Sequence, residues 1–171
     1  MDAPLVSVIL ATYNGSRFLA EAISSVLDQD YQNIELIVIN DASTDTKVPE
    51  IVRWFQSQDE RVRYELNPRN MERSWSKNRW VELAKGEFIA FIDDDDVWQE
   101  SKISEQMRII LQDDTIGVVG TWASFIDEHE KSIGETRHLK TLKEDIYNNI
   151  LLSNQLIQSS VLIRKKVFSQ V

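Results

Sequence analysis

The sequence predicts an α/β fold in which a parallel β-sheet is covered by helices on both faces. Short apolar segments rich in β-branched residues alternate along the 171 residues with segments of helical periodicity. This alternation is typical of parallel sheets. Polar loops follow three of the apolar segments, and ligands of such sheets bind beyond the carboxyl ends of the strands. A ligand site is therefore expected at these loops.

The first half of the chain contains three predicted strands with two helices between them. Leu5–Ala11 is apolar and rich in β-branched residues, which indicates a buried strand. Apolar residues then recur at helical spacing over Arg17–Gln29. Ile34–Ile39 repeats the strand pattern, and Lys47–Gln58 repeats the helical one. Val62–Glu65 is expected to be a short third strand.

The second half continues the alternation more loosely. In order, we expect a helix at 74–84, a strand at 88–92, a helix at 102–112, a strand at 117–125, a helix at 142–151 and a strand at 159–163. Gly86 is well placed to end the first of these helices. Trp54, Trp75 and Trp80 lie within predicted helices and are expected to pack in the interior.

The composition excludes several classes of function. The net charge of −9 argues against nucleic acid as the main partner, because phosphate binding needs a basic surface. The absence of cysteine excludes disulfides, thiolate catalysis and zinc–sulfur sites. No apolar run approaches the roughly 20 residues that span a bilayer, and the N-terminus does not resemble a signal peptide. We expect one cytoplasmic domain over residues 1–171.

Four consecutive aspartates, Asp93 to Asp96, follow the predicted strand at 88–92. Adjacent carboxylates repel by roughly 1 kcal/mol per pair in water, and by more where they are partly buried. If the strand geometry continues, Asp93 and Asp95 point to one side, about 6.6 Å apart, and Asp94 and Asp96 to the other. Hard oxygen ligands of this kind select Mg, Mn or Ca ions. The alternative is a solvated turn that also caps the next helix.

Two other motifs could explain the same aspartates. An EF-hand loop is excluded because its sixth position must be Gly, and counting from Asp93 that position is Trp98. Asp93-x-Asp95-x-Val97 also resembles the first motif of haloacid-dehalogenase-type phosphatases, with Asp93 as nucleophile and Asp95 as acid/base. Against this reading, three strand–helix units come first and would have no role. A fragment that binds nucleotide or a partner chain without catalysis is a third alternative.

The other two loops suit a nucleotide. Asp45 or a neighbouring hydroxyl residue can cap the helix that follows the second loop, but capping does not explain Asp41 at the strand end. A carboxylate there can accept an N–H from a nucleobase, and Tyr13 could stack on that base. No G-x-G-x-x-G or G-x-x-x-x-G-K-[ST] pattern is present, so a metal would have to hold the phosphates.

Three segments together resemble family 2 glycosyltransferases. They are VSVILATYNGSRFLAEAISSVLDQDYQNIELIVINDASTD, KGEFIAFIDDDDVW and NQLIQSSVLIRKKVF. The resemblance implies a GT-A type fold, a Rossmann-like three-layer sandwich with a mostly parallel sheet. It implies inverting transfer of a sugar from a nucleotide-diphosphate donor, usually a UDP-sugar, to a glycan or lipid-linked acceptor. The expected location is the cytoplasm, with the inner face of the membrane as the alternative.

The resemblance also assigns roles to individual residues. The nucleotide and donor side would comprise Ala11, Tyr13, Asn14, Asp41, Ser43, Asp93 and Asp94. Asp95 would be the main ligand of a Mn or Mg ion that bridges the donor diphosphate. Asp96 and Trp98 would lie on the side of the sugar and the acceptor.

The sequence departs from the family pattern in three places. Ala11 stands where a proline is common, and Asn67–Asn70 replaces a segment that usually carries Gly after its Asn. Arg69 or Arg73 could reach the donor phosphates from there. The catalytic base of the family comes after a later Gly-rich stretch, so it is expected beyond Val171. The chain is therefore expected to be a donor-binding portion, ending before the acceptor-binding part, and could be inactive alone.

Overall fold

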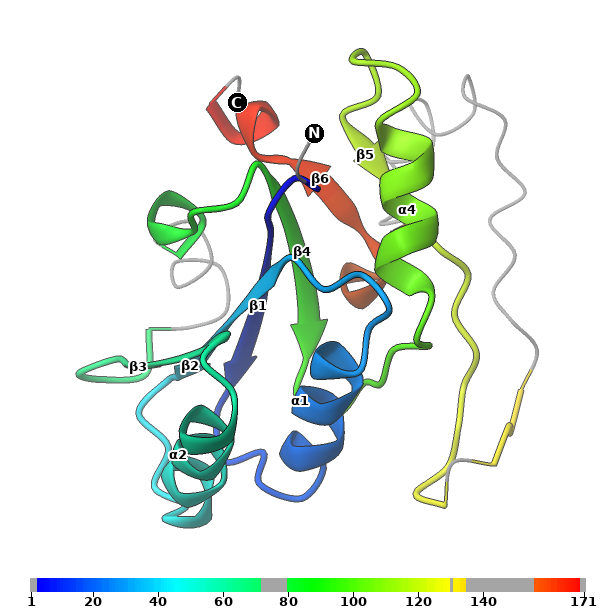
Figure 1. Cartoon of the computed structure of the whole chain (residues 1–171). Helices are drawn as coiled ribbons and strands as arrows, with labels where there is room; N and C mark the ends of the chain where they lie inside the picture. Colours follow the sequence, from blue (N-terminus) through cyan, green and yellow to red (C-terminus); the bar gives the residue numbers. More distant parts are fainter. Residues whose placement is uncertain (1–2, 72–79, 130, 135–155, 170–171) are drawn as a thin grey trace.

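The strands form one six-stranded sheet in the computed structural model, which describes residues 3–71, 80–129, 131–134 and 156–169. The order across the sheet is β3 (Val62–Leu66), β2 (Ile34–Asn40), β1 (Val6–Thr12), β4 (Phe88–Asp93), β6 (Leu162–Arg164) and β5 (Val118–Val119) (Figure 1). The first four strands in this order pair in parallel, and β6 is antiparallel to both β4 and β5. The predicted mostly parallel sheet is confirmed.

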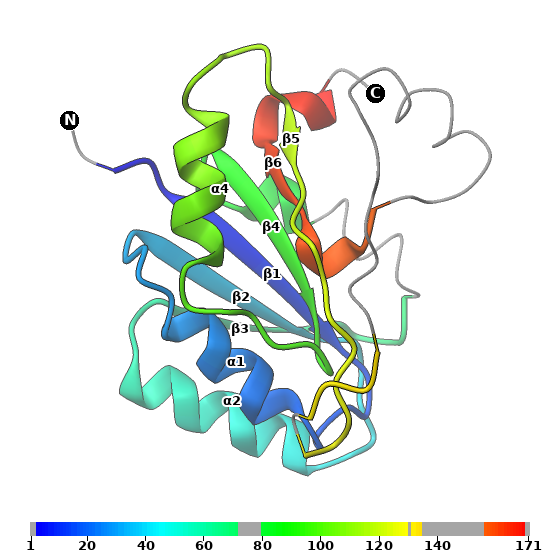
Figure 2. The same cartoon turned by 90° about the vertical axis from the view of Figure 1, so that its right-hand side faces the viewer.

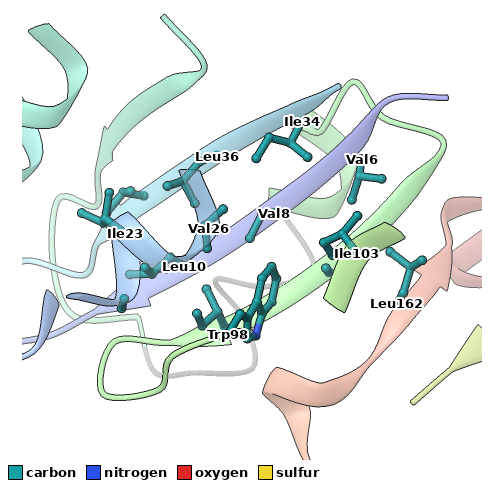
Figure 3. Packing of buried hydrophobic residues seen from close by; sticks show 14 of the residues in the cluster. Val6, Val8, Leu10, Ile23, Val26, Ile34, Leu36, Trp98, Ile103 and Leu162 are labelled. Carbon is teal, nitrogen blue, oxygen red and sulfur yellow. The ribbon is translucent and has the colours of Figure 1, made fainter. Parts of the chain in front are cut away.

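Three helices pack on one face of the sheet: α1 (Leu19–Leu27), α2 (Lys47–Gln58) and α4 (Lys102–Ile110) (Figure 2). Because side chains alternate along a strand, every second residue of β1 faces this layer. Val6, Val8 and Leu10 are such residues, and they join Ile23, Val26 and Ile103 of the helices in the larger hydrophobic core (Figure 3).

A smaller core covers the opposite face. Ile9 of β1, Ile37 of β2 and Phe91 of β4 point to this side. They pack against Trp80 in the helical stretch at residues 80–83, and against Phe168 in the 3-10 helix η2 (Lys165–Ser169). The two cores give the α/β sandwich its three layers.

Two predicted strands are much shorter than expected. The expected strand at 117–125 is reduced to the two residues of β5, and the one at 159–163 to β6, preceded by the 3-10 helix η1 (Gln158–Ser160). Ser160 explains part of this change, because its amide and hydroxyl both bond back to Ile157 O, at 3.0 and 2.7 Å. Serine side chains compete in this way with sheet pairing.

The structure gives different outcomes for the predicted burial of two tryptophans. Trp80 is buried as expected, whereas Trp54 is 60% exposed, with its ring and that of Phe55 nearly perpendicular and their centroids 4.8 Å apart. The buried face of α2 carries Val48 and Val52, and Trp54 lies off that face. Trp75 and the predicted helix at 142–151 lie outside the described residues. No helix in the described ranges is both long and apolar enough to cross a membrane.

Candidate functional site

Three polar loops meet at the carboxyl edge of the sheet, as the sequence predicts. The parallel register aligns Ala11 of β1 with Ile39 of β2 on one side and with Asp93 of β4 on the other. The loops that leave these strands therefore start side by side. They span residues 12–16, 40–45 and 93–96.

Asn14 fastens the first loop to the second. Its side-chain Oδ1 accepts hydrogen bonds from the amides of Thr44 and Asp45, at 2.8 and 3.0 Å, and its own amide donates to Ser43 Oγ at 3.0 Å. Asn14 has φ of 58°, a left-handed conformation that asparagine tolerates better than most residues. The structure thus gives both Asn14 and Ser43 a role in holding the two loops together.

The second loop contacts the start of α2. Asp45 Oδ1 accepts from the amide of Lys47, the first residue of α2, at 3.0 Å, whereas Thr46 at the N-cap position makes no side-chain cap bond. The Ser16 hydroxyl and this amide hold the pKa of Asp45 below its ordinary value. A hydrogen bond within the loop joins the amide of Ser43 to Asn40 Oδ1, at 2.7 Å. Between them, Ala42 has a φ of 59°.

Asp41 is buried and already engaged, with 8% of its surface exposed. Its Oδ1 accepts from Asn67 Nδ2 at 2.6 Å and from the amide of Met71 at 3.0 Å, while Oδ2 accepts only a longer bond of 3.2 Å from that amide. Sequence reasoning missed Asn67 as a partner of this carboxylate. Tyr13, by contrast, is 50% exposed at the same edge.

The four aspartates do not continue the strand, so the predicted alternation of their side chains is wrong. β4 ends at Asp93, and the amide of Asp96 donates to Asp93 O at 3.2 Å, which closes a turn. We call residues 93–96 the acidic turn. A turn sends its side chains in several directions, so each carboxylate has its own surroundings.

Asp94 lies against the first loop. A Cβ atom placed on Gly15 would be 1.9 Å from Asp94 Oδ2 and 2.9 Å from Thr12 Oγ1. Burial raises the pKa of Asp94, the Thr12 hydroxyl opposes the shift, and the charges of Asp95 and Asp93 add to it. Thr12 Oγ1 is itself buried and makes no hydrogen bond of normal geometry to the described residues, although this carboxyl lies beside it.

Asp93 and Asp96 face η1 instead. Gln158 Nε2 donates to Asp93 Oδ1 at 3.0 Å, and the amide of Asp93 donates to Ser159 Oγ at 3.0 Å. Burial raises the pKa of Asp96, while a hydrogen bond with the Ser159 side chain lowers it and the charges of Asp93 and Asp95 raise it further. The segment that contains Gln158 and Ser159 resembles the family, but nothing in its sequence connects these residues with aspartates more than 60 positions earlier.

Asp95 differs from the other three. Its side chain is exposed and has no hydrogen bond to any residue that the structure describes. Across the described part of the chain, no three His, Cys, Asp or Glu side chains are grouped so that they could hold a metal ion by themselves. Any cation bound at the acidic turn would need most of its ligands from water or substrate.

A family model described as "Glycosyl transferase family 2" matches residues 7–170. This chain belongs to glycosyl transferase family 2. Membership accounts for the strand–helix units that precede the acidic turn, which the haloacid-dehalogenase-type reading left without a role. The predicted family resemblance is thereby confirmed.

The curated relatives of this family 2 chain are glycosyltransferases. An uncharacterized glycosyltransferase of Methanocaldococcus jannaschii is 29% identical over 100% of the chain and 59% of its own length. Another, of Haemophilus influenzae, is 34% identical over 97% of the chain and 64% of its own length. The putative teichuronic acid biosynthesis glycosyltransferase TuaG of Bacillus subtilis is 33% identical over 64% of the chain. The chain thus spans about 60% of the first two relatives.

Solved structures confirm the GT-A fold. The mannosyltransferase PcManGT from Pyrobaculum calidifontis, in complex with GDP-Man and Mn2+, has a TM-score of 0.73 at 19% identity, with 98% of this chain and 46% of that one covered. Residues 1–349 of S. aureus TarS, in complex with UDP-GlcNAc, have a TM-score of 0.75 at 19% identity, with 96% of this chain and 46% of that one covered.

In the family 2 chain, Trp98 is part of the larger hydrophobic core. It is 8% exposed, its Nε1 donates to Ser159 O at 2.8 Å, and the Lys102 ammonium lies 4.0 Å from its ring centroid. The assignment of Trp98 to the acceptor side stays a prediction, and the finding of the structure is the burial of its ring. The local sequence could not show it, because the groups that bury Trp98 come from α4 and η1.

One hollow of about 870 Å³ lies along α1 and beside the segment that follows the acidic turn. Its lining residues are Ala20, Glu21, Ser24, Ser25, Asp28, Val97, Trp98, Glu100 and Ile126. Three carboxylates and no basic residue make this hollow unfavourable for a diphosphate. The carboxyl edge, with Tyr13, Asp41 and the acidic turn, is the better candidate site.

Proposed function

We propose that this chain binds the donor of a metal-dependent, inverting glycosyltransferase. The donor is a nucleotide-diphosphate sugar, and UDP is the nucleotide that the site favours. One observation carries the proposal. Three carboxylates of the acidic turn are engaged by neighbouring residues, and Asp95 is left exposed and unbonded at the edge where the three loops meet. That arrangement suits a ligand that brings a positive charge to Asp95.

The residues present fit a divalent cation such as Mn or Mg. Such ions keep several waters and substrate phosphates as ligands, so one or two protein carboxylates suffice. Asp95 is free to be the main ligand, and Asp93 Oδ2 accepts no hydrogen bond from the described residues, because Gln158 bonds to Oδ1. A bound cation would neutralise the charge that grows on the departing diphosphate. The Mn2+ and GDP-Man of the Pyrobaculum calidifontis structure support this choice.

The nucleobase would lie between Tyr13 and Asp41. The exposed Tyr13 ring offers a stacking face, and Asp41 Oδ2 accepts only one long bond, so it retains capacity for a ring N–H. Uracil has such an N–H beside a carbonyl. Cytosine lacks it, which is the basis for preferring UDP over CDP. The UDP and UDP-GlcNAc complexes of S. aureus TarS are in line with this preference.

The sugar would lie beside Asp94 and Asp96, beyond the diphosphate. Attack by an acceptor hydroxyl at the anomeric carbon inverts its configuration in one displacement, through a transition state of oxocarbenium character. The base that deprotonates this hydroxyl would come from polypeptide outside residues 1–171. Similarity to TuaG favours a surface-polysaccharide or lipid-linked acceptor, met in the cytoplasm at the inner face of the membrane.

Calorimetric titration of UDP tests this proposal. We expect binding in the presence of manganese that is abolished by EDTA and by Asp95→Asn. Glu60→Gln is the matched control, because Glu60 is an exposed carboxylate before the amino end of β3, at the opposite edge of the sheet. It should bind as the parent does.

Two results would overturn the proposal. One is a parent protein that binds neither UDP nor GDP with manganese. The other is an Asp95→Asn variant that binds UDP with unchanged affinity and unchanged dependence on manganese.

A further inference from the structure

The acidic turn is held from one side by two residues that lie more than 60 positions away. Gln158 Nε2 bonds to Asp93 Oδ1 at 3.0 Å, and Ser159 Oγ accepts from the Asp93 amide at 3.0 Å. The Ser159 side chain also bonds to Asp96. Both ends of the turn are therefore fixed to η1.

Buried side chains of α4 in turn hold η1 in place. Gln106 Nε2 donates to the carbonyls of both Ser160 and Val119, each at 2.8 Å. The orientation of this amide is set by the Lys102 ammonium, which donates to Gln106 Oε1 at 2.8 Å. Trp98 Nε1 adds a bond of 2.8 Å to Ser159 O. Since these donors are buried and their hydrogen bonds are satisfied, they favour one position of η1.

We propose that Gln158 and Ser159 are positioning residues, which hold the acidic turn so that Asp95 projects outward as the exposed carboxylate. The role rests on the proposed function, in which Asp95 binds the donor's cation. Nothing in the sequence pattern of the aspartates contains this information, because a free run of four like charges would spread apart to reduce its repulsion.

The chemistry of Gln158 suits this role better than a basic residue would. An amide N–H orients the Asp93 carboxylate while leaving its negative charge in place. A lysine or arginine at the same position would pair with Asp93 and weaken the attraction of the site for a divalent cation. The glutamine therefore provides orientation without competing with the cation.

Gln158→Met separates donation from packing, because methionine keeps the length of the side chain and removes the N–H. With manganese and UDP, we expect affinity 10- to 100-fold weaker than in the parent, the range seen when partners of metal-binding residues are removed. We also expect that the variant needs a higher manganese concentration than the parent for half-maximal UDP binding. Gln56→Met, on the exposed face of α2, is the control and should leave both values unchanged.

Ser159 provides a second, independent variant pair. Ser159→Ala removes the hydroxyl that bonds to the Asp93 amide and the Asp96 side chain, whereas Ser159→Thr retains a hydroxyl. We expect the manganese requirement to rise in the alanine variant and to be restored in the threonine variant. Thermal unfolding of each variant shows whether it is folded.

A measurement without ligand tests the positioning directly. Amide ¹⁵N relaxation reports picosecond-to-nanosecond order, and we expect lower order parameters at residues 93–96 in Gln158→Met than in the parent. If Gln158→Met lowers thermal stability but leaves order and manganese dependence unchanged, Gln158 is only structural and the inference is wrong. A parent that binds neither UDP nor GDP with manganese refutes the proposed function instead, whatever the variants do.

Discussion

Gly15 and Asp94 are packed so closely that a Cβ on Gly15 would lie 1.9 Å from Asp94 Oδ2. Gly15 does not have a positive φ, so the constraint here is space and not backbone conformation. The absence of a side chain at this point lets the Asp94 carboxyl lie against the first loop. The first loop and the acidic turn are thus fitted to each other.

Gly15→Ala should therefore displace Asp94. Because no atom can remain 1.9 Å from the new methyl group, the carboxyl must rotate away, and we expect UDP with manganese to bind about tenfold more weakly, or about 1.4 kcal/mol. Gly134→Ala is the control, since its Cβ would meet nothing closer than 3.7 Å. Calorimetric titration of both variants gives the comparison, and equal affinities would show that the position of Asp94 does not matter for binding.

The pairing of Asn67 with Asp41 yields a stability prediction. Both residues are buried, and the Asn67 side-chain amide donates the shortest hydrogen bond that the Asp41 carboxylate accepts, at 2.6 Å. Asn67→Ala should lower the free energy of unfolding by about 1.5–3 kcal/mol, the range for hydrogen bonds to charged groups. Urea unfolding at pH 7 measures this.

Asn67→Asp gives the sharper test of the same pair. It places two carboxyl groups within hydrogen-bonding distance, so one must be protonated or the fold must open. The variant should be much less stable than Asn67→Ala at pH 7 and should recover relative to it near pH 4. If the two variants are equally stable at pH 7, Asp41 is not held as a carboxylate by Asn67.

The sequence predicts most of the framework that carries this site. The strands that became β1, β2 and β4 are continuous apolar runs, and α2 has the predicted bounds because its apolar spacing is regular. The connectivity then places the ends of these strands at one edge. Each of these features depends on residues close together in the chain, which is why a single sequence contains them.

The orientation of the site residues could not be predicted in the same way. The directions of the aspartates depend on Gln158 and Ser159, and the burial of Trp98 depends on Lys102 and η1. In both cases the deciding partner comes from another element. The residues that follow a strand therefore predict a ligand site, but only the tertiary structure shows which side chain is free to serve it.

Lys102 gives a prediction on the dependence of stability on pH. It is buried against Trp98, and burial lowers its pKa to about 7 from 10.5. Below pH 7 both the folded and the unfolded protein carry the proton, and the cost of burying the charge is fully present. Between pH 7 and 10.5 only the unfolded state keeps it, so stability rises with pH.

Lys102→Met should remove this dependence. The free energy of unfolding of the parent, minus that of the variant, should increase as the pH is raised from 7 to 10, by up to about 1.4 kcal/mol for each unit of pKa difference. Lys131→Met, at an exposed position, is the control and should show no such trend. A parent–variant difference that is flat from pH 7 to 10 would show that Lys102 keeps its ordinary pKa in the fold.

Glu35 should have the opposite dependence on pH. Its carboxylate accepts from the Ser7 hydroxyl and the Lys85 amide, each at 2.6 Å, and from Arg63 at 3.1 Å. Burial alone would raise the pKa of Glu35, but these hydrogen bonds and the Arg63 charge lower it overall. The stabilisation is present above the ordinary pKa near 4.5 and is lost as the pH falls through the lower folded-state value.

Glu35→Gln should cost about 1.5–3 kcal/mol at pH 7, because the charge-assisted bond with Arg63 is lost, and clearly less at pH 3. Urea unfolding at the two pH values, with Glu60→Gln as the exposed control, measures the change. A cost that is the same at both would mean that the ionised form of Glu35 contributes nothing to the stability of the sheet.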